Sequence, residues 1–241
     1  MKKSLYVFFI LLLSVSLFVG CSKNTSSESD GDTIKVGLNY ELSGNVATYG
    51  QSLTEGIELA IEEINENGGV LGKEIKITKV DNKSDSAEAA NVATRLATRD
   101  NVVVMLGPAT SGNTKGATPP AMQNKIPIVS ASATADDVTV DSNGKVREYI
   151  FKTCFSDSFQ GLKIGEFAYS DLGTKKAAIL MDNTSDYSKG LTKAFKDKFT
   201  GLGGTVVAEE AYQAKDTDYK SVLTNIKGTD AEVLYVPGYY E

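Results

Sequence analysis

The chain has 241 residues, with 25 Lys and Arg against 31 Asp and Glu, a formal net charge of −6, no His and two Cys. The acidic balance argues against a nucleic acid partner, since binding a phosphate backbone needs clustered basic side chains. The absence of His excludes a Ser-His-Asp triad, a Cys-His pair and His-based metal sites. Two Cys are too few for a zinc site made of Cys alone. We therefore expect no catalytic residues, no metal and no cofactor.

The N-terminus has the layout of a secretory signal. Lys2-Lys3 precedes an apolar run over 5–19, and the small residue Gly20 follows it. This order of a basic start, an apolar middle and a small residue is typical of signal peptides. The run is also short for a transmembrane helix, which needs about 20 apolar residues. We therefore predict a signal peptide over 1–20, with a retained membrane anchor as the alternative.

Residues 18–21 resemble a bacterial lipobox, the motif in which a lipid is attached to a Cys and the chain is cleaved before it. Cys21 stands at the position of that Cys, although Phe18 is less usual there than Leu. The resemblance implies a membrane anchor through the lipid, and the polar stretch up to Asp32 makes residues 21–32 a flexible tether. A plain signal peptide with an incidental Cys is the alternative. After cleavage, Cys154 and a lipidated Cys21 could form no disulfide within the chain.

From Ile34 onward, short β-branched runs alternate with longer segments of helical spacing. Strands are predicted at Ile34–Leu38, Ile75–Val80, Val102–Leu106, Ile126–Val129, Ile150–Lys152, Ala177–Met181, Thr205–Glu210 and Val233–Val236. Helices are predicted along the apolar stripe of Leu53, Ile57, Ala60, Ile61 and Ile64, ending at Gly68-Gly69, and over Ser86–Arg99, Phe159–Tyr169, Tyr187–Phe199 and Tyr219–Ile226. The alternation favours the α/β class, with parallel sheets covered on both faces.

Two lobes are predicted, because a second strand–helix series begins after residue 153. The first α/β lobe covers 33–153 and the second covers 154–241. The second series stops after its last strand without a following helix. As given, the second lobe is therefore expected to be incomplete.

Two loops of small and hydroxyl side chains follow predicted strands. Residues 107–114 leave the strand at 102–106, and residues 130–137 leave the strand at 126–129. In open α/β sheets ligands bind beyond the carboxyl ends of strands, where helix N-termini favour anions, so these loops are candidates for holding a carboxylate. Ordinary turn and N-cap chemistry explains each loop equally well.

Other candidate sites are weaker. No Gly-rich nucleotide motif opens a helix, and Gly201–Gly204 follows a helix, where it is typical of a C-cap. Acidic residues also gather on the first predicted helix, but on the side away from its apolar stripe: Glu55, Glu58, Glu62, Glu63 and Glu66. They are better explained as a solvated surface than as a metal or catalytic pair.

These segments, in this order, resemble the substrate-binding proteins of ABC transporters of the leucine/isoleucine/valine type, which have the two-lobed type I periplasmic-binding-protein fold. The stretches that carry the likeness are Ile34–Gly37, Leu42–Gly44 with Tyr49-Gly50, Gly56–Ala60, Ile64-Asn65, Gly68–Gly72, Asp81-Asn82, Leu106–Pro108 with Ser111, Ser132–Thr134 and Asp186–Gly190. The likeness runs from about Thr33 to the last residue.

The resemblance implies that two lobes close on a small amino acid and that no bond is made or broken. Ser111 and Thr134 would bind the ligand carboxylate. The Ser132 carbonyl and the Thr134 hydroxyl would accept from the ammonium, and three tyrosines would wall the pocket: Tyr49, Tyr187 and Tyr239.

The resemblance also implies partners and a place in the cell. The partners would be a Leu, Ile or Val type ligand and the membrane permease of an ABC importer, and the protein would be a monomer anchored outside the cytoplasm. In the family an acidic ligand residue lies beyond a Tyr like Tyr239, and the given chain ends before that position. The returning strands that complete both lobes in the family are not reached either. The chain therefore resembles the front portion of a longer receptor, with the second lobe and part of the first incomplete.

Two other classes stay open. A ligand-sensing module of the same fold would signal to a receptor or kinase instead of feeding a permease. An exported α/β enzyme is the third class, and the absence of a nucleophile–base pair argues against it. Among ligands, aliphatic amino acids, amides, urea and aromatic acids all occur in the family.

Overall fold

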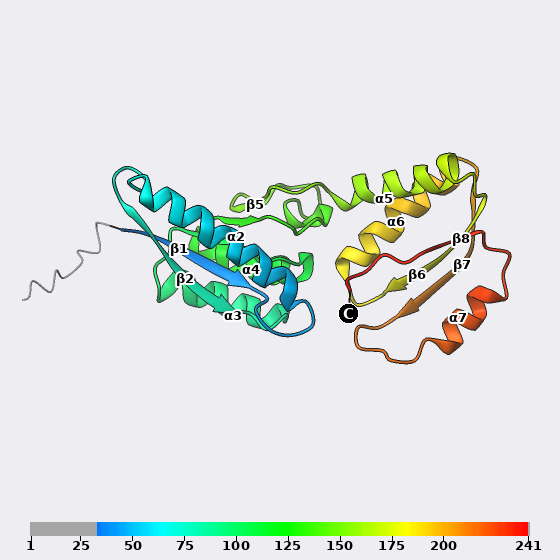
Figure 1. The fold of residues 1–241 in the computed structure, drawn as a ribbon, viewed down its shortest axis with the longest axis horizontal. Coiled ribbons are helices and arrows are strands. Elements are labelled where there is room, and N and C mark those ends of the chain that lie inside the picture. Colours follow the sequence, from blue (N-terminus) through cyan, green and yellow to red (C-terminus); the bar gives the residue numbers. More distant parts are fainter. Residues whose placement is uncertain (1–32, 241) are drawn as a thin grey trace, which may run out of the picture. The chain divides into compact units, whose positions relative to one another are not determined.

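The computed structural model describes residues 33–240 (Figure 1). The predicted signal peptide 1–20, the lipidated Cys21 and the tether 21–32 lie outside the described residues. Within the described part, none of the helices combines the length and the apolar character needed to span a membrane. Residues Thr33–Glu241 form one compact unit that contains two separate sheets.

The first sheet has five parallel strands in the order β2-β1-β3-β4-β5. Its strands are β1 (Thr33–Tyr40), β2 (Glu74–Asp81), β3 (Val104–Leu106), β4 (Ile128–Ser130) and β5 (Ile150–Lys152). All of the strands predicted for this region are confirmed. β3 begins later than predicted because the N–H of Val102 closes the preceding turn on Leu96 O, at 3.1 Å, instead of joining the ladder.

Helices cover both faces of the first sheet. α3 (Ser86–Thr98) and α4 (Ser111–Asn124) place Val92, Leu96 and Ala117 against Met105 and Ile128 on one face. α2 (Ala47–Glu66) covers the other face, where a cluster around Leu38 and Tyr40 is buried. Burial of these side chains is the main stabilising contribution to this half of the fold.

The apolar stripe of α2 is narrower than predicted. Leu53 and Ile57 pack on the sheet and Ile61 is buried, but Ala60 is exposed and Ile64 is 39% exposed. Residues four apart lie in one row along a helix, and the row of 53, 57 and 61 is the one that faces inward. Ala60 and Ile64 belong to the next row, which lies beside the contact.

The second sheet has three parallel strands in the order β7-β6-β8. Its elements are α5 (Asp157–Glu166) with a π-helical turn at Phe167–Asp171, β6 (Lys176–Asp182), α6 (Asp186–Gly201), β7 (Thr205–Tyr212), α7 (Lys220–Lys227) and β8 (Val233–Tyr235). Phe195 and Phe199 of α6 pack on one face, and Ile226 of α7 packs on the other. The strands and helices predicted here are confirmed, as is the turn after α6, where Gly203 has φ +100°.

α5 and α6 pack closely because glycines face the neighbouring helix. A Cβ added at Gly161 would lie 2.6 Å from Ala194 Cβ, and one added at Gly165 would lie 3.0 Å from Phe195 O. Only glycine, which has no Cβ, allows the two helices to approach this closely. The packing brings the N-terminal ends of α5 and α6 together, and both ends contribute to the site described below.

The fold class is therefore α/β with parallel sheets, as predicted, and each sheet has helices on both faces (Figure 1). β5 belongs to the first sheet and β6 opens the second. The division into lobes at 153/154 stays a prediction, because residues 33–241 form one compact unit.

Candidate ligand-binding site

The site is built on the N-terminus of α4, which follows the carboxyl end of β3. Thr110 caps the helix, its hydroxyl accepting from the N–H of Asn113 at 3.4 Å. The preceding turn depends on Gly107, which has φ +93° and where a Cβ would lie 2.4 Å from Asn39 O. These constraints hold the 107–114 loop against β1, so its polar groups have defined positions.

The buried carboxylate of Glu41 satisfies the first free N–H groups of this loop. It accepts hydrogen bonds from the backbone N–H of Ala109 at 2.9 Å and from the backbone N–H and hydroxyl of Thr110 at 3.1 and 2.9 Å. It also accepts from the side-chain amide of Asn113 at 2.7 Å. Glu41 is fully buried. A negative charge at a helix N-terminus is favourable, and here it belongs to the protein itself.

A cavity of about 280 Å³ lies beside this helix end. It brings together most of the predicted ligand-binding residues: Tyr49, Ser132, Thr134, Tyr187 and Tyr239. The rest of its lining is Ala109, Thr110, Ala131, Cys154, Phe155 and Gln160. The volume lies just below the range of about 300–1,000 Å³ typical of ligand pockets, which suits a small molecule. The roles of these residues in binding stay predictions.

Ser111 lies behind the cavity wall rather than on it. It is 1% exposed, and its hydroxyl accepts from the N–H of Ala135 at 3.1 Å. Burial raises the pKa of the Tyr239 phenol, and the backbone of Ser111 acts in the opposite direction. Ser111 thus connects the two hydroxyl loops, and its predicted contact with a carboxylate stays a prediction.

Three tyrosines stand against one another at the cavity. The ring of Tyr187 stacks on Tyr239 with centroids 5.1 Å apart, and Tyr49 meets Tyr239 edge-on at 6.0 Å. The Tyr187 hydroxyl accepts from Gln160 at 3.3 Å. Burial raises the pKa of Tyr187, so the hydroxyl is neutral at physiological pH and can donate or accept. The tyrosines make the wall apolar, with polar tips.

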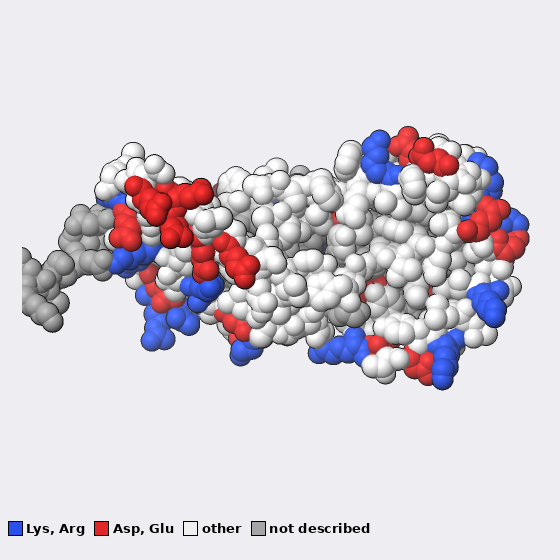
Figure 2. Space-filling model, viewed as in Figure 1, with Lys and Arg blue, Asp and Glu red and all other residues white. Residues whose placement is uncertain are grey.

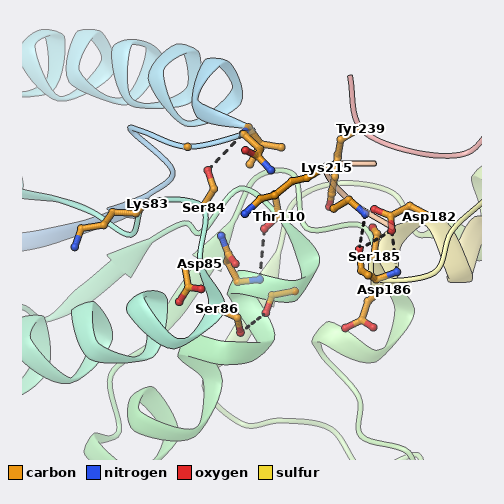
Figure 3. Close-up of a pocket in the computed structure, with 17 residues that line it drawn as sticks. Lys83, Ser84, Asp85, Ser86, Thr110, Asp182, Ser185, Asp186, Lys215 and Tyr239 are labelled. Atoms are coloured by element: carbon orange, nitrogen blue, oxygen red, sulfur yellow. Dashed lines mark hydrogen bonds between the residues drawn. The ribbon is translucent and has the colours of Figure 1, made fainter. Parts of the chain in front are cut away.

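A second, larger cavity of about 460 Å³ lies on the other side of Thr110 and Tyr239, which line both cavities. Its lining includes the N-cap residues of four helices: Val46, Asp85, Thr110 and Ser185. Figure 3 shows Lys215 extending into this cavity, whereas Lys83 points away from it. The lining of this larger cavity is polar, whereas the smaller cavity has an aromatic wall. The smaller cavity is the one lined by most of the predicted ligand-binding residues.

The acidic side chains of α2 take no part in either cavity. Figure 2 shows them gathered over α2 on the surface. Most are exposed, and Glu58 pairs with Lys79, both side chains being 40% exposed. The prediction of a solvated face is confirmed. Among residues 33–240, no three His, Cys, Asp or Glu side chains gather in a way that could hold a metal ion.

Two buried carboxylates near the cavity were not found from the sequence. Glu41 follows β1, and Asp157 opens α5, where an acidic residue is ordinary helix N-terminal chemistry. No spacing or motif distinguishes them from exposed acids. Cys154, Phe155 and Gln160 were missed as well, because the predicted boundary near 153 gave no reason to place them at a site.

A family model described as "Periplasmic binding protein" matches residues 33–239. The Leu/Ile/Val-binding protein BraC3 of Rhizobium johnstonii is 30% identical over 207 residues, covering 86% of this chain and 55% of its own. A branched-chain amino acid transporter substrate-binding protein of Streptococcus pneumoniae, solved in complex with isoleucine, is 44% identical with a TM-score of 0.79, over 86% of this chain and 57% of that one.

Another solved relative has a different ligand. A solute-binding protein of an ABC transporter from Rhodopseudomonas palustris, in complex with 3,4-dihydroxybenzoic acid, is 26% identical with a TM-score of 0.75. It covers 85% of this chain and 54% of its own. The chain thus spans about half the length of the relatives it matches. Together, the matching family model and the parallel α/β sheets show that this chain belongs to the periplasmic binding protein family, with the type I fold.

Proposed function

We propose that the protein is an extracytoplasmic solute-binding lipoprotein of an ABC importer. It binds a branched-chain or similar small amino acid and delivers it to membrane permease subunits, without making or breaking a bond. The observation that carries the proposal is the 280 Å³ cavity, because five residues that were selected by resemblance, from four separate segments of the chain, line it together. The relatives named for Leu, Ile and Val binding support the same ligand class.

The lining supports a zwitterionic ligand with an apolar side chain. Thr134 and Ser132 offer hydroxyl and backbone groups at one end, and the tyrosine wall offers apolar surface at the other. In this proposal the ligand contacts residues that precede 153 and residues that follow it, and so stabilises a closed state that the permease recognises. Lys115 of α4 and Asp186 of α6, 2.6 Å apart, would add to that closed state.

Membrane attachment is part of the proposal. Cleavage before Cys21 and a lipid on that Cys would hold the receptor near its permease, with 21–32 as the tether. The receptor would act as a monomer. Mass spectrometry of the membrane fraction would find the lipid on Cys21, and a mature chain that begins elsewhere would remove this part of the proposal.

An aromatic carboxylic acid is the second candidate ligand, favoured by the tyrosine wall and by the relative solved with 3,4-dihydroxybenzoic acid. Calorimetric titration of the full-length gene product separates the two. We expect heat of binding with leucine, isoleucine or valine and none with benzoate or 4-hydroxybenzoate. Binding of the benzoates alone would replace the proposal with the second candidate, and turnover of any ligand would contradict both.

A further inference from the structure

The segment 237–240 follows β8 and connects the second sheet with the start of α2. Its beginning is fixed to the second sheet, because the buried hydroxyl of Ser188, on α6, donates to Pro237 O at 2.6 Å. Gly238 lies close to β7, where an added Cβ would meet the Tyr212 hydroxyl at 2.7 Å. The end of the segment contacts α2, through residues that lie 192 positions apart in the chain.

The two tyrosines of this segment have different surroundings. Tyr239 lines both cavities, and Figure 3 shows it at the larger one. Tyr240 lines neither, and it is 53% exposed. Its ring lies against Tyr49 with centroids 4.9 Å apart, and its hydroxyl accepts from the N–H of Thr48 at 3.1 Å. Tyr240 thus contacts two consecutive residues of α2 without reaching the ligand cavity.

The hydrogen bond from Thr48 gives α2 a cap that its own start does not supply. Helices usually begin at a Ser, Thr, Asp or Asn whose side chain accepts from the N–H of the second or third helical residue. α2 begins after Val46, which has no side-chain acceptor, and its first turn carries no acidic residue. Thr48 is the second residue of α2, so the Tyr240 oxygen occupies the place of the missing cap. The partial negative charge of that oxygen also suits the positive end of the helix.

The start of α2 matters for the site because it carries Tyr49, which lines the 280 Å³ cavity. Gly50, the next residue, holds this turn against the loop after β1, since an added Cβ would lie 2.1 Å from Glu41 O. The Tyr49 ring is 40% exposed and contacts two others, Tyr239 edge-on at 6.0 Å and Tyr240 at 4.9 Å. Tyr240 therefore holds Tyr49 twice, through the backbone before it and through its ring.

We propose that Tyr240 is a positioning residue for ligand capture, which clamps the start of α2 and so sets Tyr49 in the wall of the 280 Å³ cavity. The inference rests on the proposed function, in which residues on both sides of 153 close on the ligand. Tyr240 follows 153, whereas Thr48 and Tyr49 precede it, so the clamp forms when the two parts come together. It stabilises the closed state without touching the ligand.

The test measures the affinity of the full-length protein for leucine by calorimetry. Tyr240→Ala removes both the hydrogen bond and the ring contact, and it should weaken binding about 10-fold. Tyr240→Phe keeps the ring and removes the hydroxyl. Its loss should be smaller, about 2- to 5-fold, because the hydrogen bond is exposed to water.

Tyr219→Ala is the matched control. The Tyr219 ring also meets another tyrosine, Tyr212, edge-on at 5.5 Å, and its hydroxyl also bonds to the backbone, donating to Asp216 O at 2.8 Å. Tyr219 lines neither cavity. Its substitution removes the same kinds of contact and should leave the affinity for leucine unchanged.

A double-mutant cycle separates positioning from a purely structural role. If Tyr240 acts through Tyr49, Tyr240→Ala should change the affinity by less than about 2-fold in a chain that already carries Tyr49→Ala. A residue that only stabilised the fold would have equal effects in both backgrounds. Thermal unfolding without ligand checks that each variant is folded, and Tyr240→Phe serves in the same cycle if Tyr240→Ala is not.

The outcomes separate the two claims. If the unaltered protein binds leucine and Tyr240→Ala binds it equally well, or loses the same factor in both backgrounds, the inference about Tyr240 fails and the proposed function stands. 4-Hydroxybenzoate is the second probe. If the protein binds it and not leucine, the proposed amino acid ligand fails, and the same variants decide the inference with this probe. If neither probe binds, both claims fail.

Discussion

Ser111 and Thr134 are neighbours in the site but differ in what their hydroxyls do. The Thr134 side chain lines the cavity, whereas the Ser111 hydroxyl accepts from the N–H of Ala135 and so positions the loop that carries Thr134. We expect the Thr134 hydroxyl to contact the ligand directly. We expect Ser111 to act mainly by positioning the loop that carries Thr134, and its contact with the ligand carboxylate stays a prediction from resemblance.

Thr134→Ala and Ser111→Ala should each weaken amino acid binding by about 1–3 kcal/mol, because each leaves a charged ligand group or a buried N–H without its partner. Ser111→Ala should also lower the free energy of unfolding by about 1 kcal/mol, since the Ala135 N–H is buried. Calorimetry and urea unfolding measure the two effects. Ser142→Ala, in an exposed turn, is the control. Unchanged affinity in both site variants would remove these residues from the site.

At the residue scale, the positions of site residues in loops that follow strands could be predicted from the sequence, but the burial of charged side chains could not. Ser132 and Thr134 could be placed because loops at the carboxyl ends of parallel strands meet at one edge of a sheet. Asp157 and Glu41 could not, because an acidic residue is exposed in most sequences and its burial depends on packing between distant elements. The role of each carboxylate can be assigned only when its neighbours in the fold are known.

At the element scale, α4 depends on Glu41. The helix has no apolar stripe and contains Pro119 and Pro120, so propensity alone gives little support. Its start is instead determined by the bonds that Glu41 accepts from Ala109, Thr110 and Asn113. This is also why the extent of α4 could not be predicted, while α3, with Ala89, Val92, Ala93 and Leu96 buried, could.

Glu41→Ala should lower the free energy of unfolding by about 3 kcal/mol or more, because it leaves several buried donors unsatisfied. Glu41→Gln keeps the shape and part of the acceptor capacity, so its loss should be smaller, about 1–3 kcal/mol. Glu62→Gln, on the exposed face of α2, should stay within about 0.5 kcal/mol. Denaturant unfolding measures all three. Equal stability of Glu41→Ala and Glu62→Gln would show that the α4 start does not depend on this carboxylate.

The strands were the most predictable elements. Each is a short β-branched run bounded by turn residues, and buried parallel strands have few alternatives. Errors concentrated at the ends, as at β3, and in the width of the α2 stripe, where Ala60 and Ile64 are exposed. Both depend on which neighbouring element covers a residue, and that information is tertiary.

At the scale of the whole molecule, contacts link residues that precede 153 with residues that follow it. Lys115 pairs with Asp186 at 2.6 Å, and the N–H of Thr48 donates to the Tyr240 hydroxyl at 3.1 Å. Tyr49 meets Tyr240 at 4.9 Å between ring centroids. Tyr49 also lines the small cavity, together with residues that follow 153. A ligand there would touch both halves at once, as closure on a ligand requires.

The most direct test of the proposed function is a crystal structure of the full-length protein grown with leucine. The account predicts leucine in the 280 Å³ cavity, with its amine at Thr134 and its side chain against Tyr49, Tyr187 and Tyr239. Leucine bound instead in the 460 Å³ cavity beside Ser84 and Lys215, or outside both cavities, would contradict it.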